Sequence, residues 1–205
     1  EITSDTLPIE SPVSYSFMED FARSEVKENL NQLGFDTRGF PRTKEFFPAG
    51  FLRKMGILGI YFPFTGEGYI DPSLHPLEKP FTLAHEMAHS FGITHEGEAN
   101  FVAWLVGDNS DNPLFRYSAQ LKLFRYQLRD LFISDRNAYQ KILEDLDPGI
   151  KNDLESIHRH SRRIRPISDR LSRLSNDVFL KTQGVGKGIQ SYAELPMLVY
   201  AWESR

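Results

Sequence analysis

The sequence predicts an α+β fold that is mainly α-helical, with a small β-sheet ahead of one central helix. Two observations carry this prediction. Apolar residues recur at helical spacing along most of the chain, whereas the short run 55–63 is rich in Ile and aromatic residues, as β-strands are. The chain has 205 residues, 40% apolar and 25% charged, which suits one globular domain. We therefore expect a single domain over residues 1–205.

The first part, residues 1–50, is expected to form an extended entry segment, one helix and loops. Three prolines among polar residues indicate that residues 1–14 are extended. Apolar residues from Phe17 to Leu33 fall at helical spacing, and Gly34 ends the pattern. Residues 35–50 contain further glycines and prolines, so they are predicted to form a loop with at most a short turn.

The middle part, residues 51–107, is expected to hold the sheet and two helices. A strand is predicted within residues 55–63, followed by a glycine-flanked turn and a returning strand at Tyr69–Ile70. A helix is predicted over Phe81–Phe91, because Pro80 suits a first helical turn and Gly92 a helix end. A second helix is expected from about Glu96 to Val106.

The remainder, residues 108–205, is expected to be a helical subdomain. Helices are predicted over residues 114–133, 138–146 and 152–175, the last of them broken or bent at Pro166. A glycine-rich turn at 184–188 precedes a final apolar helix or strand at 191–202.

Composition excludes several classes of site. The formal net charge of −4 gives no reason to expect nucleic acid as a partner. The absence of cysteine removes disulfides, thiolate metal sites and cysteine nucleophiles. No run approaches the roughly 18 apolar residues of a membrane span. Because the first residues lack both a methionine and a signal-peptide pattern, we expect this sequence to be a soluble piece of a longer protein.

The segment His85-Glu86-Met87-Ala88-His89 carries the clearest chemical signal. Residues four apart on a helix share one face, so the two imidazoles can bind a single zinc ion. Glu86 lies about 100° around the helix from His85, where it can accept a proton from an activated water. The flanking residues are apolar, so polar groups of this helix would be buried and would need partners. The pattern therefore predicts a zinc site.

A catalytic zinc site needs a third protein ligand, and the following helix offers two candidates, Glu96 and Glu98. Glu96 is favoured because Asn100 shares its helical face and can orient a ligand histidine from the second shell. Glu98 remains the alternative, although its position suggests packing and a favourable interaction with the helix dipole. The neighbouring His95 could also bind a metal, but it is interpreted as a flanking surface residue.

Two resemblances rest on these residues. Glu96, Ala99, Asn100 and Ala103 resemble the third-ligand helix of gluzincin metallopeptidases. The sequence is also similar to a bacterial family known as domain of unknown function 3810, in the three segments Gly59–Glu67, Pro80–His89 and Glu98–Phe101. The C-terminal pattern of that family, a Leu-Lys, a glycine turn and a Ser-Tyr, is present as well. The similarity covers about residues 55–202 and is strongest over 57–105.

These resemblances imply a zincin-like catalytic core and a peptidase of the gluzincin type. They also imply that Tyr192 donates a hydrogen bond to the oxyanion of the tetrahedral intermediate. The interpretation of Tyr192 as a half-buried structural residue is at least as well supported. Family members carry transmembrane helices before the peptidase part, so the resemblance implies a membrane anchor upstream of residue 1 and a membrane-associated bacterial protein.

The expected function is hydrolysis of a peptide or protein substrate by a zinc-activated water, with Glu86 as general base. The strand at Leu58–Phe62 could pair with an extended peptide. Glu67 either lines the cleft or belongs to a glycine-flanked turn, and the turn is favoured. The basic stretch 158–163 is interpreted as a solvated helix face, with contact to an anionic membrane surface as its alternative. The main rival is a zinc-binding regulatory or scaffold domain without proteolytic activity. Two further alternatives are a metal-free helical interaction module and a hydrolase that acts on another substrate.

Overall fold

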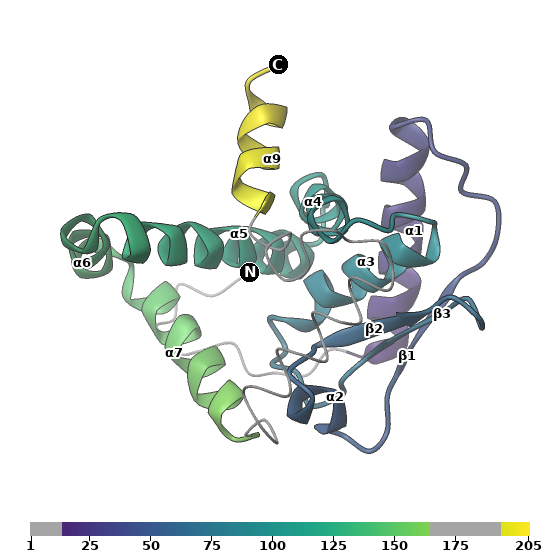
Figure 1. Ribbon diagram of the computed structural model, residues 1–205, viewed down its shortest axis with the longest axis horizontal. Helices are drawn as coiled ribbons and strands as arrows, with labels where there is room; N and C mark the ends of the chain where they lie inside the picture. Colours follow the sequence, from purple (N-terminus) through teal and green to yellow (C-terminus); the bar gives the residue numbers. More distant parts are fainter. Residues whose placement is uncertain (1–13, 165–193) are drawn as a thin grey trace.

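A computed structural model describes residues 14–164 and 194–205 (Figure 1). The described elements are, in chain order, α1 (Tyr15–Gln32), β1 (Arg42–Glu45), α2 (Phe51–Lys54), β2 (Gly59–Phe62), β3 (Glu67–Ile70), α3 (Lys79–Ser90), α4 (Glu96–Asp108), α5 (Pro113–Ser134), α6 (Arg136–Asp145), α7 (Pro148–Arg162) and α9 (Leu195–Glu203). The chain is mainly helical with one small sheet, which confirms the predicted α+β class.

The sheet has three strands in the order β1-β3-β2. β2 and β3 form the predicted antiparallel pair, with Tyr61 opposite Gly68. β1 pairs with β3 in parallel, with Thr43 also opposite Gly68. Within the part of the chain that is described, β2 is therefore an edge strand whose outer side has no strand partner.

The predicted loop over residues 35–50 is wrong at β1. Its sequence, Arg-Thr-Lys-Glu, has no apolar alternation, so period-2 patterning could not reveal it. The strand depends on distant contacts instead. Its one buried side chain, Thr43, donates a hydrogen bond to Met87 Sδ of α3 at 3.8 Å, and Tyr15 of α1 donates to the Thr43 carbonyl at 2.8 Å. The short helix α2 was not predicted either.

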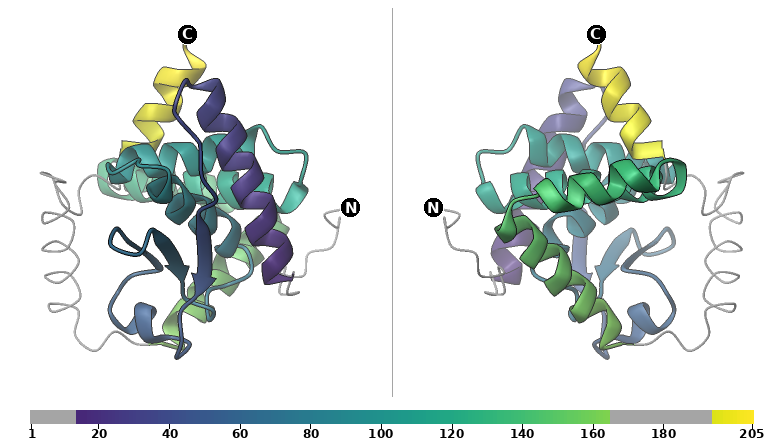
Figure 2. Two further views of the ribbon diagram at one scale, coloured as in Figure 1. Left: turned by 90° about the vertical axis from the view of Figure 1, so that its right-hand side faces the viewer. Right: turned by 90° about the vertical axis from the view of Figure 1, so that its left-hand side faces the viewer.

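α3 is the central element of the fold. It contacts all three strands on one side and α1, α4 and α5 on the other sides. Figure 2 shows α1 on one flank of the molecule and α5, α6 and α7 on the opposite flank. As predicted, Pro80 lies in the first turn of α3. Its apolar side chains belong to the main core, where Leu83, Ala84, Met87 and Ala88 are fully buried.

The C-terminal helices lie close to their predicted positions. α5 and α6 match the expected ranges, and the predicted final apolar segment is a helix, α9. α7 begins at Pro148, earlier than expected, and Asp147 caps it by accepting a hydrogen bond from the Gly149 N–H. The bend at Pro166 and the glycine turn at 184–188 lie outside the described residues. None of the helices described is long and apolar enough to cross a membrane.

Candidate metal centre

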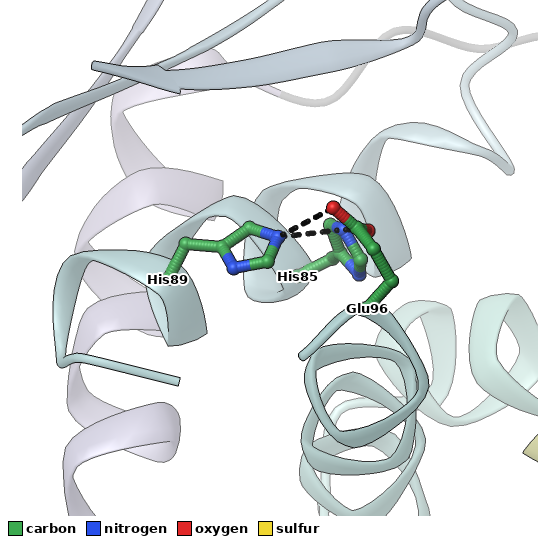
Figure 3. Close-up of side chains that lie close together, drawn as sticks. All are labelled: His85, His89 and Glu96. Carbon is green, nitrogen blue, oxygen red and sulfur yellow. Dashed lines mark hydrogen bonds and ion pairs between the residues drawn. The ribbon is translucent and has the colours of Figure 1, made fainter. Parts of the chain in front are cut away.

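Two imidazoles of α3 face the start of α4. His85 and His89 lie one helical turn apart, and their Nε2 atoms are 3.1 Å from each other. Their rings are nearly perpendicular, with centroids 4.7 Å apart. His85 is buried and His89 is partly buried. Both nitrogens therefore point to one spot at the edge of the core, as Figure 3 shows.

The third group comes from the first residue of α4. α3 ends in a tight turn, in which the Ile93 N–H donates to the Ala88 carbonyl and Gly92 has a φ of 94°. This turn is short enough that Glu96 begins the next helix directly opposite the histidines. Its Oε2 lies 3.1 Å from His85 Nε2, and its Oε1 lies 3.6 Å from His89 Nε2.

The spacing of these atoms suits a single small cation. One ligand atom from each of His85, His89 and Glu96 lies within 4.8 Å of the others. For zinc bonds of 2.0–2.1 Å in a tetrahedron, ligand atoms should be about 3.3 Å apart. The Nε2 atoms are 3.1 Å apart, and the Glu96 oxygens lie 3.1 Å (Oε2 to His85) and 3.6 Å (Oε1 to His89) from them, so the separations are close to this value although each contact uses a different carboxylate oxygen. Two imidazoles and one carboxylate are also a donor set that zinc accepts, so the residues fit a zinc ion that leaves a fourth position for another ligand.

A backbone contact fixes the orientation of His89. Its Nδ1 lies 2.6 Å from the carbonyl oxygen of Ile93. A carbonyl can only accept, so Nδ1 must carry the proton, and the neutral ring then presents the lone pair of Nε2 to the cation site. The turn after α3 thus does two things, because it places Glu96 and also sets the tautomer of His89.

Without a metal, the three groups form a strongly coupled cluster. Burial lowers the pKa of His85, and the adjacent His89 lowers it further. For His89 burial acts in the same direction, but the hydrogen bond to Glu96 and the charge of Glu86 outweigh it and raise its pKa to about 9. Burial opposes the ionisation of Glu96, yet hydrogen bonds to both histidines hold its pKa well below the usual range. The site therefore concentrates negative charge on Glu96, between two imidazoles.

Glu86 lies beside this cluster and makes no hydrogen bond or ion pair through its carboxylate with any described residue. The side chain is 5% exposed, and burial raises its pKa to about 8. It packs against the edge strand, since a Cβ added at Gly59 would lie 2.4 Å from Glu86 Oε1. Only glycine leaves room for this carboxylate. A glycine inside a strand is a sequence feature that can indicate such a close approach.

The other candidate residues that the structure describes do not join the cluster of His85, His89 and Glu96. Glu98 is exposed to solvent, and the described chain does not bring it into the cluster. Asn100 is buried one turn after Glu96, and its Nδ2 has no hydrogen-bond partner within the described residues. Its support of a ligand histidine stays a prediction. His95 is partly buried and lies 3.8 Å from Glu194, away from the cluster. Tyr192 lies outside the described residues.

Two further sequence interpretations concern surface groups. Glu67 pairs with Lys44 across the sheet and accepts a hydrogen bond from the Tyr69 hydroxyl at 2.7 Å, so sheet partners hold it. In the basic stretch 158–163, Arg159 and Arg162 are exposed, whereas His160 contacts the Ser73 carbonyl through Nε2 at 2.6 Å. The stretch is thus largely exposed, with one anchoring histidine.

Two polar residues near the cluster were missed by sequence reasoning. Lys122 and Tyr126 lie one turn apart on α5, and they line a pocket together with His85 and Glu86. The only sequence signal was a lysine between Leu121 and Leu123 in an otherwise apolar stretch. Such a lysine is ordinarily solvated, so nothing local connected it with a motif far earlier in the chain.

A family model described as "Protein of unknown function (DUF3810)" matches residues 1–200. This match covers nearly the whole chain, so the chain belongs to that family. No curated protein and no solved structure matches it.

Proposed function

We propose that this family member is a zinc-dependent peptidase of the gluzincin type. His85, His89 and Glu96 would hold the ion. When bound, zinc would supply a Lewis acid that acidifies a water molecule and polarises the scissile carbonyl. The chain's own residues would provide the proton transfer, the binding of the substrate backbone and the exclusion of bulk water.

The observation that carries the proposal is the state of Glu86. A buried carboxylate without a hydrogen-bonding partner is costly, and proteins keep such groups mainly where they serve chemistry. A divalent cation nearby would lower the pKa of Glu86 from its raised value of about 8 toward neutral pH. The group would then accept a proton from the attacking water and later pass it to the leaving amine.

The edge strand supports a peptide as the substrate. β2 has an open side among the described elements and contacts α3, which carries the two histidines of the cluster. Its Tyr61 ring lies parallel to the His89 ring, with centroids 6.5 Å apart. An extended peptide could add to this edge by backbone hydrogen bonds, which would bring one of its carbonyl groups toward the cation site. An ester or a small amide would gain nothing from such an edge.

The alternative, a zinc-binding regulatory or scaffold domain, is less well supported. Structural zinc sites are usually closed by four protein ligands, whereas the described residues supply three. Such a site also has no use for a carboxylate like Glu86. An occupied fourth position, filled by a protein group, would favour this alternative.

The test compares the zinc-loaded wild type with Glu86→Gln on a mixture of fluorescence-quenched peptides of varied sequence. We expect the variant to retain about one zinc per chain and to cleave at least 100-fold more slowly, since a general base contributes about 10²–10⁴-fold. A variant that cleaves at the wild-type rate would refute this mechanism. A wild type that binds zinc and cleaves no peptide would favour the scaffold domain.

A further inference from the structure

A small pocket opens directly beside the candidate metal centre. Its volume is about 240 Å³, and His85 and Glu86 form part of its wall. The segment leading into β2, residues 56–59, closes one side, and α5 closes another. Pockets for drug-sized ligands are typically about 300–1,000 Å³, so this one suits a single side chain.

The cation of this pocket is Lys122. No carboxylate of a described residue lies within ion-pair distance of its ammonium group, which instead lies 5.4 Å from the Phe81 ring centroid and 5.5 Å from that of Tyr126. The nearby Glu78 is already paired with Arg125 at 2.7 Å. Burial lowers the pKa of Lys122 to about 8, which still leaves the amine mainly protonated at neutral pH. The pocket thus holds a positive charge that makes no ion pair with a described carboxylate, although the charge of Glu78 acts on it from nearby.

Two hydrogen-bond donors accompany this charge. Asn100 also lines the pocket; it is 2% exposed, and its Nδ2 has no partner among the described residues. Burial raises the pKa of Tyr126 to about 12, so its hydroxyl remains a neutral donor. An ammonium, an amide N–H and a phenol O–H are together suited to a carboxylate. Asn100 lies close enough to the Tyr126 hydroxyl to lower its pKa, so these two groups lie side by side in the pocket wall.

The position of Glu86 gives the pocket its place in the reaction. In the proposed function, Glu86 delivers a proton to the leaving amine, so the residue on the amine side of the scissile bond must lie next to Glu86. The pocket shares Glu86 as part of its wall. It is therefore the space available to that residue's side chain or, where that residue is the last one, to its terminal carboxylate.

We propose that this pocket selects substrates with a carboxylate on the residue that follows the scissile bond, with Lys122 as ion-pair partner and Asn100 and Tyr126 as donors. This inference rests on the proposed function. It assigns a substrate class to the same site. The carboxylate has two sources, an Asp or Glu side chain within a peptide, or the C-terminus of the substrate itself.

Binding is measured first, independently of turnover, by NMR titration of the ¹⁵N-labelled protein. One probe pair, Glu-Ala amide against Gln-Ala amide, tests the side-chain carboxylate. The other, free alanine against alaninamide, tests the terminal carboxylate. We expect the carboxylate member of one pair to bind about tenfold more tightly in the wild type, as charge-assisted hydrogen bonds allow. The probe pair whose two members differ in affinity shows whether the carboxylate belongs to a side chain or to the C-terminus.

Two variants assign the effect to Lys122. Lys122→Met should abolish the preference, whereas Lys141→Met, which removes an exposed lysine of α6, should leave it unchanged. Lys122→Arg keeps the charge and should retain part of the preference, which separates loss of charge from loss of folding. Equal binding of both members in both pairs, or a preference that survives Lys122→Met, would overturn the inference.

Hydrolysis of matched peptides with Glu or Gln after the scissile bond separates this inference from the proposed function. Cleavage of both peptides at equal rates, together with equal binding of alanine and alaninamide, would retain the peptidase and reject the carboxylate pocket. Carboxylate binding that depends on Lys122, without cleavage of any peptide, would retain the pocket and reject the peptidase. A preference for Glu that falls at least tenfold in Lys122→Met would support both.

Discussion

Gly59 of the edge strand lies directly against the carboxylate of Glu86 on α3. A methyl group at position 59 would come within 2.4 Å of Oε1 and 2.7 Å of Cγ of Glu86. The strand that could receive a peptide and the residue that could take up a proton are thus in contact, and the absence of a side chain at one residue permits this. The position of this carboxylate depends on the strand as much as on its own helix.

Gly59→Ala should therefore displace Glu86 without disturbing the metal ligands. We expect zinc content to stay at the wild-type level while peptide cleavage falls by about 100-fold, the cost of misplacing a catalytic group by roughly 1 Å. Overpacking should also lower the free energy of unfolding by about 1–3 kcal/mol. In a Glu86→Ala background the space is vacant, so the same substitution should cost little stability. An additive loss in the double variant would show that the crowding arises elsewhere.

The third ligand can be identified by a matched pair of substitutions in the first turn of α4. Glu96→Gln should weaken zinc binding by more than the roughly 10–100-fold typical of supporting residues, because it removes a ligand oxygen's charge. Glu98→Gln changes the charge equally at an exposed position and should leave the affinity unchanged. Competition with a chromophoric chelator measures both. Retained affinity in Glu96→Gln, with loss in Glu98→Gln, would reverse the assignment.

Zinc should stabilise the fold because it joins α3 to α4. At free zinc 1,000 times the dissociation constant, binding to the native state alone adds about 4.1 kcal/mol, equivalent to a Tm increase of about 8–16 °C for a chain of this size. The shift is measured by calorimetry with zinc and with a chelator. His89→Ala should melt at the same temperature under both conditions. A zinc-dependent shift that persisted in this variant would point to binding at another place.

Acid should weaken the anchor formed by Asp71. Burial alone would raise the pKa of this carboxyl, but hydrogen bonds from Ser73 and from the N–H groups of Gly50 and Arg53 outweigh it and lower the pKa. A carboxyl with a lowered native pKa contributes stability that is present above its unfolded value of 3.8 and is lost as the pH falls through the native value.

Asp71→Asn should accordingly cost about 1–3 kcal/mol at pH 7. The difference from the wild type should shrink as the pH falls below 3.8. Urea unfolding at several pH values measures it. Asp36→Asn, at an exposed carboxylate whose ion-pair partner among the described residues is Arg38, is the matched control and should change stability little. A constant difference across the acid range would mean that the ionised form of Asp71 is not the cause.

The centre of the site was predictable because its chemistry is local. Two histidines four apart on a helix must share a face, and the same face argument favoured Glu96 over Glu98. The structure brings Glu96 to the histidines and leaves Glu98 in solvent. Helices were predictable for a related reason, because their apolar faces repeat within a few residues.

The parts that could not be predicted depend on contacts between distant segments. β1 has a polar sequence and exists because β3 pairs with it and Thr43 reaches α3. Lys122 lines the same pocket as Glu86 only because α5 packs against α3. Residue spacing within one helix says nothing about such approaches between helices. The role of Gly59 was partly predictable, because a glycine within a strand indicates that another group lies close to it but does not identify that group.

All three candidate ligands lie within residues 85–96, on either side of a single turn. Contacts so near in sequence need little loop-closure entropy, and loops of about 10 residues close in roughly 10–100 ns, much faster than hairpins or sheets assemble. A chain still emerging from synthesis could thus capture its ion with two helical turns and a bend, before β1 meets β3. The ion would then act as a folding nucleus as well as a reagent.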